Sequence, residues 1–309
     1  MVRMGRVSEA GKAAARNLRG AGLGAVREFL SRSYRRYGRS LQPDPVFGAD
    51  WDLLVVLDAC RADLWAEVVG PDSELPVGTT RMSPGSTSTE WLAATFGEAP
   101  PERLSSTGYV TANPYSADHV DGGSLGHLRE VWRDAWDDDL GTVRPRAVTD
   151  AAIAAGRGCD LDRLVVHYMQ PHFPSIVDDS DDGVELDAFG DVPLSVWEDL
   201  RFGRRSHDEV WRAYRANLRA VLSDVRLLLS NVDAARAVIT ADHGNAVGER
   251  GLYGHAAGLA LRPLREVPWA ATTATDSRTY GPPSTAADAA ERETASPEVS
   301  ARLERLGYR

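Results

Sequence analysis

The sequence predicts an α/β fold with a mixed or mostly parallel central sheet and helices on both faces. Residues 52–57 form a continuous apolar run of the length expected for a buried parallel strand, and a second apolar strand is expected from residue 164. Helical patterns lie between such runs, and strands that alternate with helices are typical of a doubly wound sheet. The chain of 309 residues can bury a sizeable core, so one large domain is expected.

The chain divides into three parts. Residues 1–45 are expected to form a basic helical segment that Pro43 and Pro45 end, and 46–271 to form the main domain. Residues 272–309 are rich in Ala, Thr, Ser, Asp and Pro and are expected to be a flexible tail with a short terminal helix. The elements expected in the main domain are, in order, a strand at 52–57, helices at 61–69 and 90–96, a strand at 108–112, an irregular segment at 117–142, a helix at 147–156, the strand from 164, a substrate-shaping insertion at 175–206, an amphipathic helix at 210–229 and a strand at 238–240.

Two of the predicted strands end in residues that can bind metal. Asp58 directly follows the run 52–57, and Asp242 and His243 follow the strand at 238–240. In open α/β sheets the ligand crevice lies at the carboxyl ends of the strands, so these side chains can converge there. Carboxylate oxygen and imidazole nitrogen suit Zn²⁺, Mn²⁺ or a similar divalent ion. The alternatives are that Asp58 caps the helix after it and that Asp242 and His243 are solvated loop residues.

With both segments in view, the chain resembles the alkaline phosphatase and sulfatase superfamily. Members have an early strand ending in Asp, a later Ser, Thr or Cys nucleophile, and a late strand reading Asp-His-Gly, followed by Gly-Glu and then Gly-His or Gly-Lys. Here these elements are Asp58, the segment 83–91, and residues 240–244 with Glu249 and His255. Their order and separations match over residues 50–258.

The resemblance implies an alkaline-phosphatase-like sheet and a metal-dependent hydrolase of phosphate or sulfate esters. Asp58, Asp242 and His243 are then expected to hold a divalent ion, which is Zn, Mn, Ca or Mg. His255 is expected to bind a second ion or to donate a hydrogen bond to the anion, so the number of ions is one or two.

Four hydroxyl residues compete as the nucleophile. The segment Gly85–Trp91 resembles that of the lipoteichoic-acid-synthase-like branch, where a threonine is the nucleophile, and that register selects Thr87 with Ser86 as runner-up. A hydroxyl is a poor nucleophile at neutral pH and needs a metal ion to become accessible as an alkoxide. The alternative is that these hydroxyls only cap the helix that begins near Glu90.

Neither cysteine fits the formylglycine motif of sulfatases, which reads Cys-x-Pro-x-Arg or Cys-x-Ala-x-Arg. Cys60 is followed by a segment that lacks the arginine, and Cys159 has Leu161 where proline or alanine belongs. This departure argues against classical sulfatase activity and favours phosphoryl transfer.

Four more residues are candidates for the site. His172, in a His-x-Pro turn, matches the family position that faces substrate or a second metal, and Asn113 ends the strand at 108–112. Arg61 can pair with an anion through two hydrogen bonds, and the alternative, favoured at least equally, is a structural salt bridge to Asp63 or another acid. His167 lies inside a strand, where a core histidine is expected in preference to the alternative of a ligand.

Composition limits the partners of the chain. The net charge of −10 argues against nucleic-acid binding, and the two cysteines give no disulfide framework. No apolar run is long enough to span a membrane and no signal-peptide core is present, so a cytoplasmic location is expected. The basic helix at 1–45 offers the alternative of peripheral contact with anionic lipid.

The function expected from the sequence is metal-dependent ester hydrolysis through a covalent Thr87 intermediate. One alternative is a phosphoglycerol or phosphoethanolamine transferase, which has the same site but passes the group to a glycan or lipid acceptor. Another is a binding protein that has kept the fold without catalysis.

Overall fold

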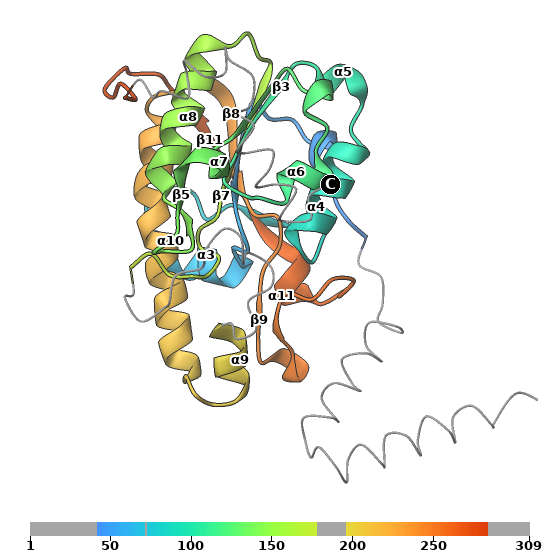
Figure 1. Ribbon diagram of the computed structural model, residues 1–309, viewed down its shortest axis with the longest axis vertical. Coiled ribbons are helices and arrows are strands. Elements are labelled where there is room, and N and C mark those ends of the chain that lie inside the picture. Colours follow the sequence, from blue (N-terminus) through green and yellow to red (C-terminus); the bar gives the residue numbers. More distant parts are fainter. Residues whose placement is uncertain (1–41, 72, 178–195, 284–309) are drawn as a thin grey trace, which may run out of the picture.

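A seven-stranded sheet forms the centre of the molecule (Figure 1). The computed structural model describes residues 42–71, 73–177 and 196–283. The strand order is β2-β11-β8-β1-β7-β3-β4, and β8, β1, β7, β3 and β4 are parallel, whereas β11 is antiparallel to both of its neighbours. The strands are β1 (Leu53–Leu57), β2 (Thr79–Met82), β3 (Thr107–Thr111), β4 (His127–Glu130), β7 (Arg163–Tyr168), β8 (Ala234–Thr240) and β11 (Glu266–Ala274). The predicted mostly parallel sheet is thus confirmed.

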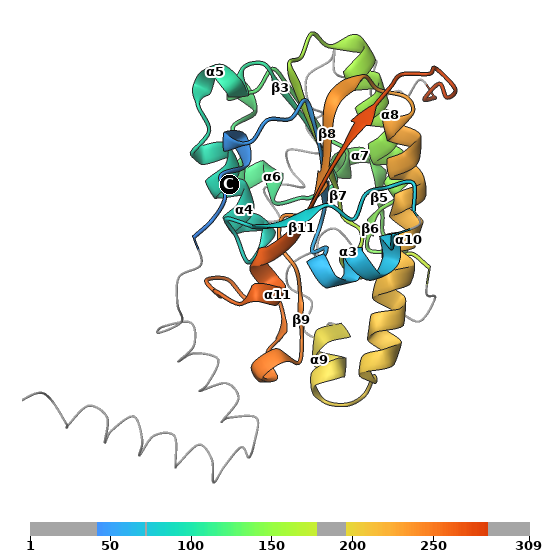
Figure 2. The same ribbon diagram turned by 180° about the vertical axis from the view of Figure 1, so that it is seen from behind.

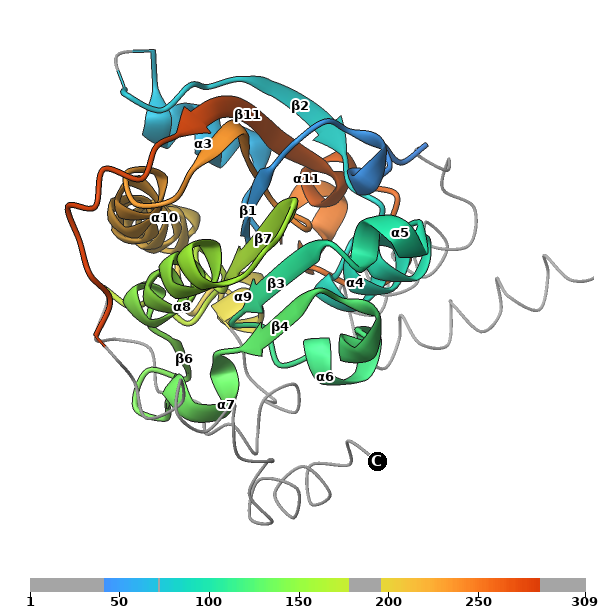
Figure 3. The ribbon, with the colours of Figure 1, turned by 90° about the horizontal axis from the view of Figure 1, so that it is seen from above.

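Helices cover both faces of this sheet (Figure 3). Helices α3, α8 and α10 lie over one face, and α4, α5 and α6 lie over the other. Two small hairpins, β5 (Trp136–Asp137) with β6 (Thr142–Val143) and β9 (Ala246–Val247) with β10 (Tyr253–Gly254), lie outside the sheet. The helices are α3 (Ala62–Val69), α4 (Ser88–Gly97), α5 (Pro101–Leu104), α6 (Ser116–His119), α7 (Trp132–Ala135), α8 (Pro145–Gly158), α9 (Val196–Arg201), α10 (His207–Leu229) and α11 (Arg262–Arg265), with short 3₁₀ turns at Val46–Gly48, Gly122–Ser124 and Glu249–Gly251.

Strand β1 explains why the core has two halves. All five of its residues are buried, as expected for a central parallel strand covered on both faces. Leu53, Val55 and Leu57 pack into the half with α8 and α10, whereas Leu54 and Val56 pack into the half with α4. This alternation follows from the two-residue period of a strand.

Helix α10 agrees with the amphipathic helix expected at 210–229. It begins at a capping box in which Ser206 and Glu209 satisfy each other's backbone N–H groups. The apolar residues at helical spacing are buried, namely Tyr214, Leu218, Val221, Val225 and Leu228.

The structure differs from the expected elements at two strands. The segment expected to be irregular at 117–142 contributes the edge strand β4, whose half-buried residues give no clear alternation. The tail expected from residue 272 begins with the last residues of β11, which pair with β8 (Figure 2). Beyond β11, the Thr275 N–H donates to Leu229 O and Arg157 forms an ion pair with Asp276, so this end is held against α8 and α10. Polar composition could not reveal these contacts.

Several expectations lie outside the described residues: the helix within 1–41, most of the insertion at 175–206, and the terminal helix. Among the described residues, no helix is both long and apolar enough to cross a membrane.

Because β1, β3, β7 and β8 are parallel, their carboxyl ends meet at one edge of the sheet. The residues that come after these strands include Asp58, Asn113, His172 and Asp242. His167 is the next-to-last residue of β7 itself. This edge is therefore where the predicted site residues can meet.

Candidate metal centre and nucleophile

Two backbone N–H groups fix the orientation of the Asp242 carboxylate. Asp242 Oδ1 accepts hydrogen bonds from Ala59 N at 2.9 Å and from His243 N at 2.8 Å. Ala59 can donate in this direction because it adopts φ of 59°, an uncommon conformation for a residue other than glycine. The other oxygen, Asp242 Oδ2, is buried without a hydrogen-bond partner in the described residues. It is therefore free to bind a ligand.

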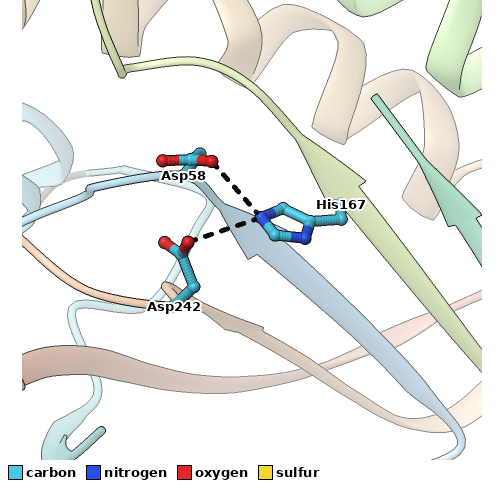
Figure 4. A group of neighbouring side chains, drawn as sticks. All are labelled: Asp58, His167 and Asp242. Carbon is cyan, nitrogen blue, oxygen red and sulfur yellow. Dashed lines mark ion pairs between the residues drawn. The ribbon is translucent and has the colours of Figure 1, made fainter. Parts of the chain in front are cut away.

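A buried cluster of side chains that can supply metal ligands, called the donor cluster, is formed by Asp58, Asp242, His167 and His243. His167 Nε2 lies 3.7 Å from Asp58 Oδ2 and 3.7 Å from Asp242 Oδ2 (Figure 4). His243 Nε2 lies 3.6 Å from Asp58 Oδ1 and 3.5 Å from Asp242 Oδ2. These distances are too long for hydrogen bonds. Ligand atoms on one tetrahedral Zn²⁺ are about 3.3 Å apart, so the spacing suits atoms that share a cation.

Burial and charge in this cluster also favour a cation. Burial, and then the charge of Asp242, raises the pKa of Asp58 well above its usual value. Burial alone would raise the pKa of Asp242, but His243, His167 and the hydrogen bonds to it outweigh this effect and lower it. Two buried carboxylates this close repel each other when both are ionised. A divalent cation would remove that repulsion, so the residues present fit a metal site.

Both imidazoles of the cluster are oriented by a second contact. His243 Nδ1 lies 2.9 Å from Gly244 O, so it donates there and leaves the lone pair of Nε2 facing the carboxylates. His167 Nδ1 lies 2.9 Å from the Tyr109 hydroxyl, and burial lowers the pKa of His167 to about 4, so its ring is neutral at pH 7. His167 Nε2 has no hydrogen-bond partner in the described residues. The structure thus adds His167, which the sequence assigned to the core, to the candidate ligands.

We expect Tyr109→Phe to weaken Zn²⁺ binding about 10- to 100-fold, because metal-binding histidines depend on the partner of their second nitrogen. Tyr168→Phe is the matched control, since Tyr168 is also fully buried but its hydroxyl bonds to Thr149 at 2.8 Å. Competition with a chromophoric chelator measures both affinities. Equal affinities for the two variants would contradict a ligand role for His167.

The four hydroxyls of the nucleophile segment have different partners. Thr87 is the N-cap of α4, and its Oγ1 accepts from Glu90 N at 3.2 Å and lies 3.0 Å from Thr89 Oγ1. Ser86 Oγ lies 2.8 Å from Glu90 Oε2. Ser88 Oγ donates to Asp58 Oδ2 at 3.2 Å and lies 3.3 Å from His243 Nε2. The hydroxyl that faces the donor cluster is therefore that of Ser88, one position beyond the predicted Thr87.

The surroundings of Ser88 suit a nucleophile. It is the first residue of α4, so the positive end of the helix dipole stabilises negative charge on its oxygen. Asn113 Nδ2 donates to Asp58 Oδ2 at 2.8 Å, which holds the carboxylate that accepts from Ser88. Asn113 thus orients Asp58 in this structure.

His172 and His255 form a pair beside the cluster. Their Nε2 atoms are 2.9 Å apart, and the His255 ring centroid lies 4.5 Å from that of His243. Burial lowers the pKa of His172 to about 4 and also lowers that of His255. Because two unprotonated nitrogens cannot bond to each other, one Nε2 carries a proton. The structure therefore brings both predicted histidines together, with a proton between them.

No family model matches the chain, and no curated protein matches it. Solved structures resemble it at low identity. Lipooligosaccharide phosphoethanolamine transferase A from Neisseria meningitidis, an integral membrane protein, has a TM-score of 0.49 at 14% identity over 85% of this chain and 56% of its own. The C-terminal periplasmic domain of phosphoethanolamine transferase EptC from Campylobacter jejuni has a TM-score of 0.47 at 14% identity, over 72% of this chain and 78% of its own.

A sulfatase-type protein from Bacteroides thetaiotaomicron has a TM-score of 0.43 at 11% identity, over 75% of this chain and 64% of its own. The chain is similar to phosphoethanolamine transferases and sulfatases. These are classes of the superfamily that the sequence motifs resemble. The chain spans little more than half of the Neisseria protein, with 56% of that protein's length covered, and each of these TM-scores is below 0.5. The function proposed below therefore rests on the geometry of the site.

The guanidinium of Arg61 forms salt bridges and hydrogen bonds within the chain. Its Nε and Nη2 donate to both oxygens of Asp63 at 2.8 and 2.6 Å, and its Nη1 donates to Asn245 O and Glu249 Oε1, each at 2.7 Å. Of the two alternatives for Arg61, this geometry matches the salt bridge. The guanidinium ties the end of β1 to the loop after β8, and it explains the position of Glu249 in that loop.

Proposed function

We propose that the chain transfers a phosphoryl-type group from a phosphate ester through a covalent intermediate on Ser88. One observation carries this proposal: the Ser88 hydroxyl contacts Asp58 and His243, which belong to a buried cluster with unpartnered donor atoms. Asp58, Asp242, His243 and His167 would hold the divalent ion. The ion, when bound, lowers the pKa of a hydroxyl beside it and polarises the phosphoryl oxygens.

The residues of the chain have separate tasks in this proposal. Asp58 accepts the hydrogen bond of Ser88 and aims its oxygen, and the N-terminus of α4 stabilises the charge that develops on it. His172 and His255 lie beside the cluster with one N–H between their Nε2 atoms. Because both rings are neutral, this N–H can donate a hydrogen bond to a phosphoryl oxygen but does not act as the acid that protonates the leaving alcohol.

The acceptor in the second step distinguishes transfer from hydrolysis. Phosphoethanolamine transfer is the activity named for the Neisseria and Campylobacter proteins, and we propose an alcohol acceptor on a glycan or lipid as the first candidate. Water as acceptor, which gives ester hydrolysis, is the second candidate and is the reaction that the sequence motifs lead us to expect. The cytoplasmic location expected from the sequence stays a prediction.

Product analysis with and without an acceptor tests this proposal. Purified protein with Zn²⁺, Mn²⁺, Mg²⁺ or Ca²⁺ is given phosphatidylethanolamine, bis-p-nitrophenyl phosphate or p-nitrophenyl sulfate. We expect diester cleavage to exceed sulfate cleavage, because no cysteine matches the formylglycine motif. An added glucosamine-containing lipid should receive the phosphoethanolamine group if the protein is a transferase. Release of free phosphoethanolamine alone would indicate a hydrolase, and no turnover with any ion would favour a binding protein.

A further inference from the structure

The loop after His255 is held by side chains of the nucleophile segment. Residues 255–261 lie between β10 and α11 and belong to no helix or strand. Gly258 N donates to Glu90 Oε1 at 2.7 Å, and Leu259 N donates to Ser86 Oγ at 3.2 Å. Ser86 Oγ also lies 3.1 Å from Ala256 O. Two backbone N–H groups of this loop are thus bonded to two side chains that lie on either side of Ser88, and the one hydrogen of the Ser86 hydroxyl lies between Ala256 O and Glu90.

Ser86 and Glu90 also bond to each other. Glu90 Oε2 accepts from Ser86 N and from Ser86 Oγ, both at 2.8 Å. The two oxygens of the Glu90 carboxylate therefore bind different partners: Oε1 accepts from the loop at Gly258 N, and Oε2 accepts from Ser86. The Ser86 side chain is fully buried, so losing these bonds would leave polar groups without partners.

Capping of α4 does not explain these contacts. The cap is already supplied by the Thr87 hydroxyl, which accepts from Glu90 N. Ser86 and Ala256 are 170 positions apart, so the bonds join two distant parts of the chain. Leu259 and Leu261 also pack in a small apolar cluster, against which Ala256 lies. Ser86 and Glu90 thus hold the backbone of residues 256–259, which directly follows His255.

We infer that Ser86 and Glu90 are positioning residues that fix His255 relative to Ser88. This inference rests on the proposed function for its catalytic meaning, whereas the coupling between the two loops is a structural statement. Ser88 follows Ser86 by two residues, and His255 precedes Ala256 directly. A shift between the two loops therefore changes the distance between the nucleophile and the proton shared by His172 and His255. Such misplacement slows the chemical step without removing a reacting group.

The first test measures the coupling without activity. Ser86→Ala is expected to speed amide hydrogen exchange at Gly258 and Leu259, whereas Zn²⁺ affinity stays at the wild-type value because the metal-binding side chains are intact. Thr89→Ala is the matched control: it removes a hydroxyl of the same segment that bonds to Thr87 and not to the loop. Ser86→Thr, which keeps the hydroxyl, should restore slow exchange. Unchanged exchange in Ser86→Ala would overturn the inference even if the wild-type protein turned over no substrate.

The second test is a double-mutant cycle on turnover. We expect Ser86→Ala to lower kcat roughly 10- to 100-fold in the wild-type background. In the His255→Ala background the same change should have little further effect, because Ser86 acts through His255. Equal effects in both backgrounds would show that Ser86 supports the fold only, and would overturn its positioning role.

Discussion

Ser88→Ala is expected to lower turnover by about a thousandfold or more, with the fold and metal content retained. The change removes the hydroxyl that contacts Asp58 and His243, and with it the covalent route. Ser88 is almost fully buried, but the group removed is small, so the protein should remain folded. Steady-state kinetics with the best diester substrate, together with elemental analysis, measures this outcome.

Thr87→Ala separates the two candidate nucleophiles. Because Thr87 caps α4, its loss should reduce the free energy of unfolding by about 1 kcal/mol while the folded protein keeps near-normal turnover. Trapping the intermediate and mapping the modified peptide by mass spectrometry gives the direct answer. Modification of Thr87 or Ser86 in place of Ser88 would show that the geometry assigns the wrong hydroxyl.

The double variant Asp242→Ala with His243→Ala is expected to lose bound divalent metal. In the wild-type protein, Zn²⁺ at a thousand times its Kd should stabilise the fold by about 4 kcal/mol, and this gain should vanish in the variant. The metal-free variant should lose little stability, because removing Asp242 relieves the repulsion that helps raise the pKa of Asp58. Elemental analysis and thermal melts with and without Zn²⁺ measure these effects.

His207→Ala with Asp208→Ala is the matched control for that experiment. These residues are also an adjacent acid and histidine, 3.7 Å apart, but their side chains are 54% and 94% exposed. The control should keep the wild-type metal content and the same response to Zn²⁺. A double variant at 242 and 243 that retained its metal would place the ion elsewhere.

The positions of the acids at the sheet edge could be predicted from the sequence because strand ends are visible in it. Asp58 and Asp242 each follow an apolar run, and parallel strands bring such residues together without further information. The position of His243 could be predicted together with that of Asp242, because it is the next residue in the same motif. The edge strand β4 and the last residues of β11 could not be found in this way, because half-buried strands and tertiary contacts leave no apolar run.

The choice of hydroxyl could not be made from the sequence. Thr87 and Ser88 are adjacent, and which of them caps the helix depends on where α4 begins, a boundary that a sequence pattern defines only to within a few residues. The sequence predicts a core role for His167, because a histidine in an apolar strand usually packs there. Only the register of β7 on β1, which places His167 beside Val56, two residues before Asp58, shows that its ring reaches the acids.

The carboxylate of Asp242 is held by a backbone group that was synthesised long before it, since Ala59 and Asp242 are 183 positions apart. Strands β1, β3, β4 and β7 are synthesised before β8, but the donor cluster is incomplete until β8 follows, because Asp242 and His243 come directly after that strand. A chain released early from the ribosome therefore carries Asp58 and Ser88 without their partners. Contacts this distant in sequence also form slowly during folding, so the complete donor cluster is expected to form late.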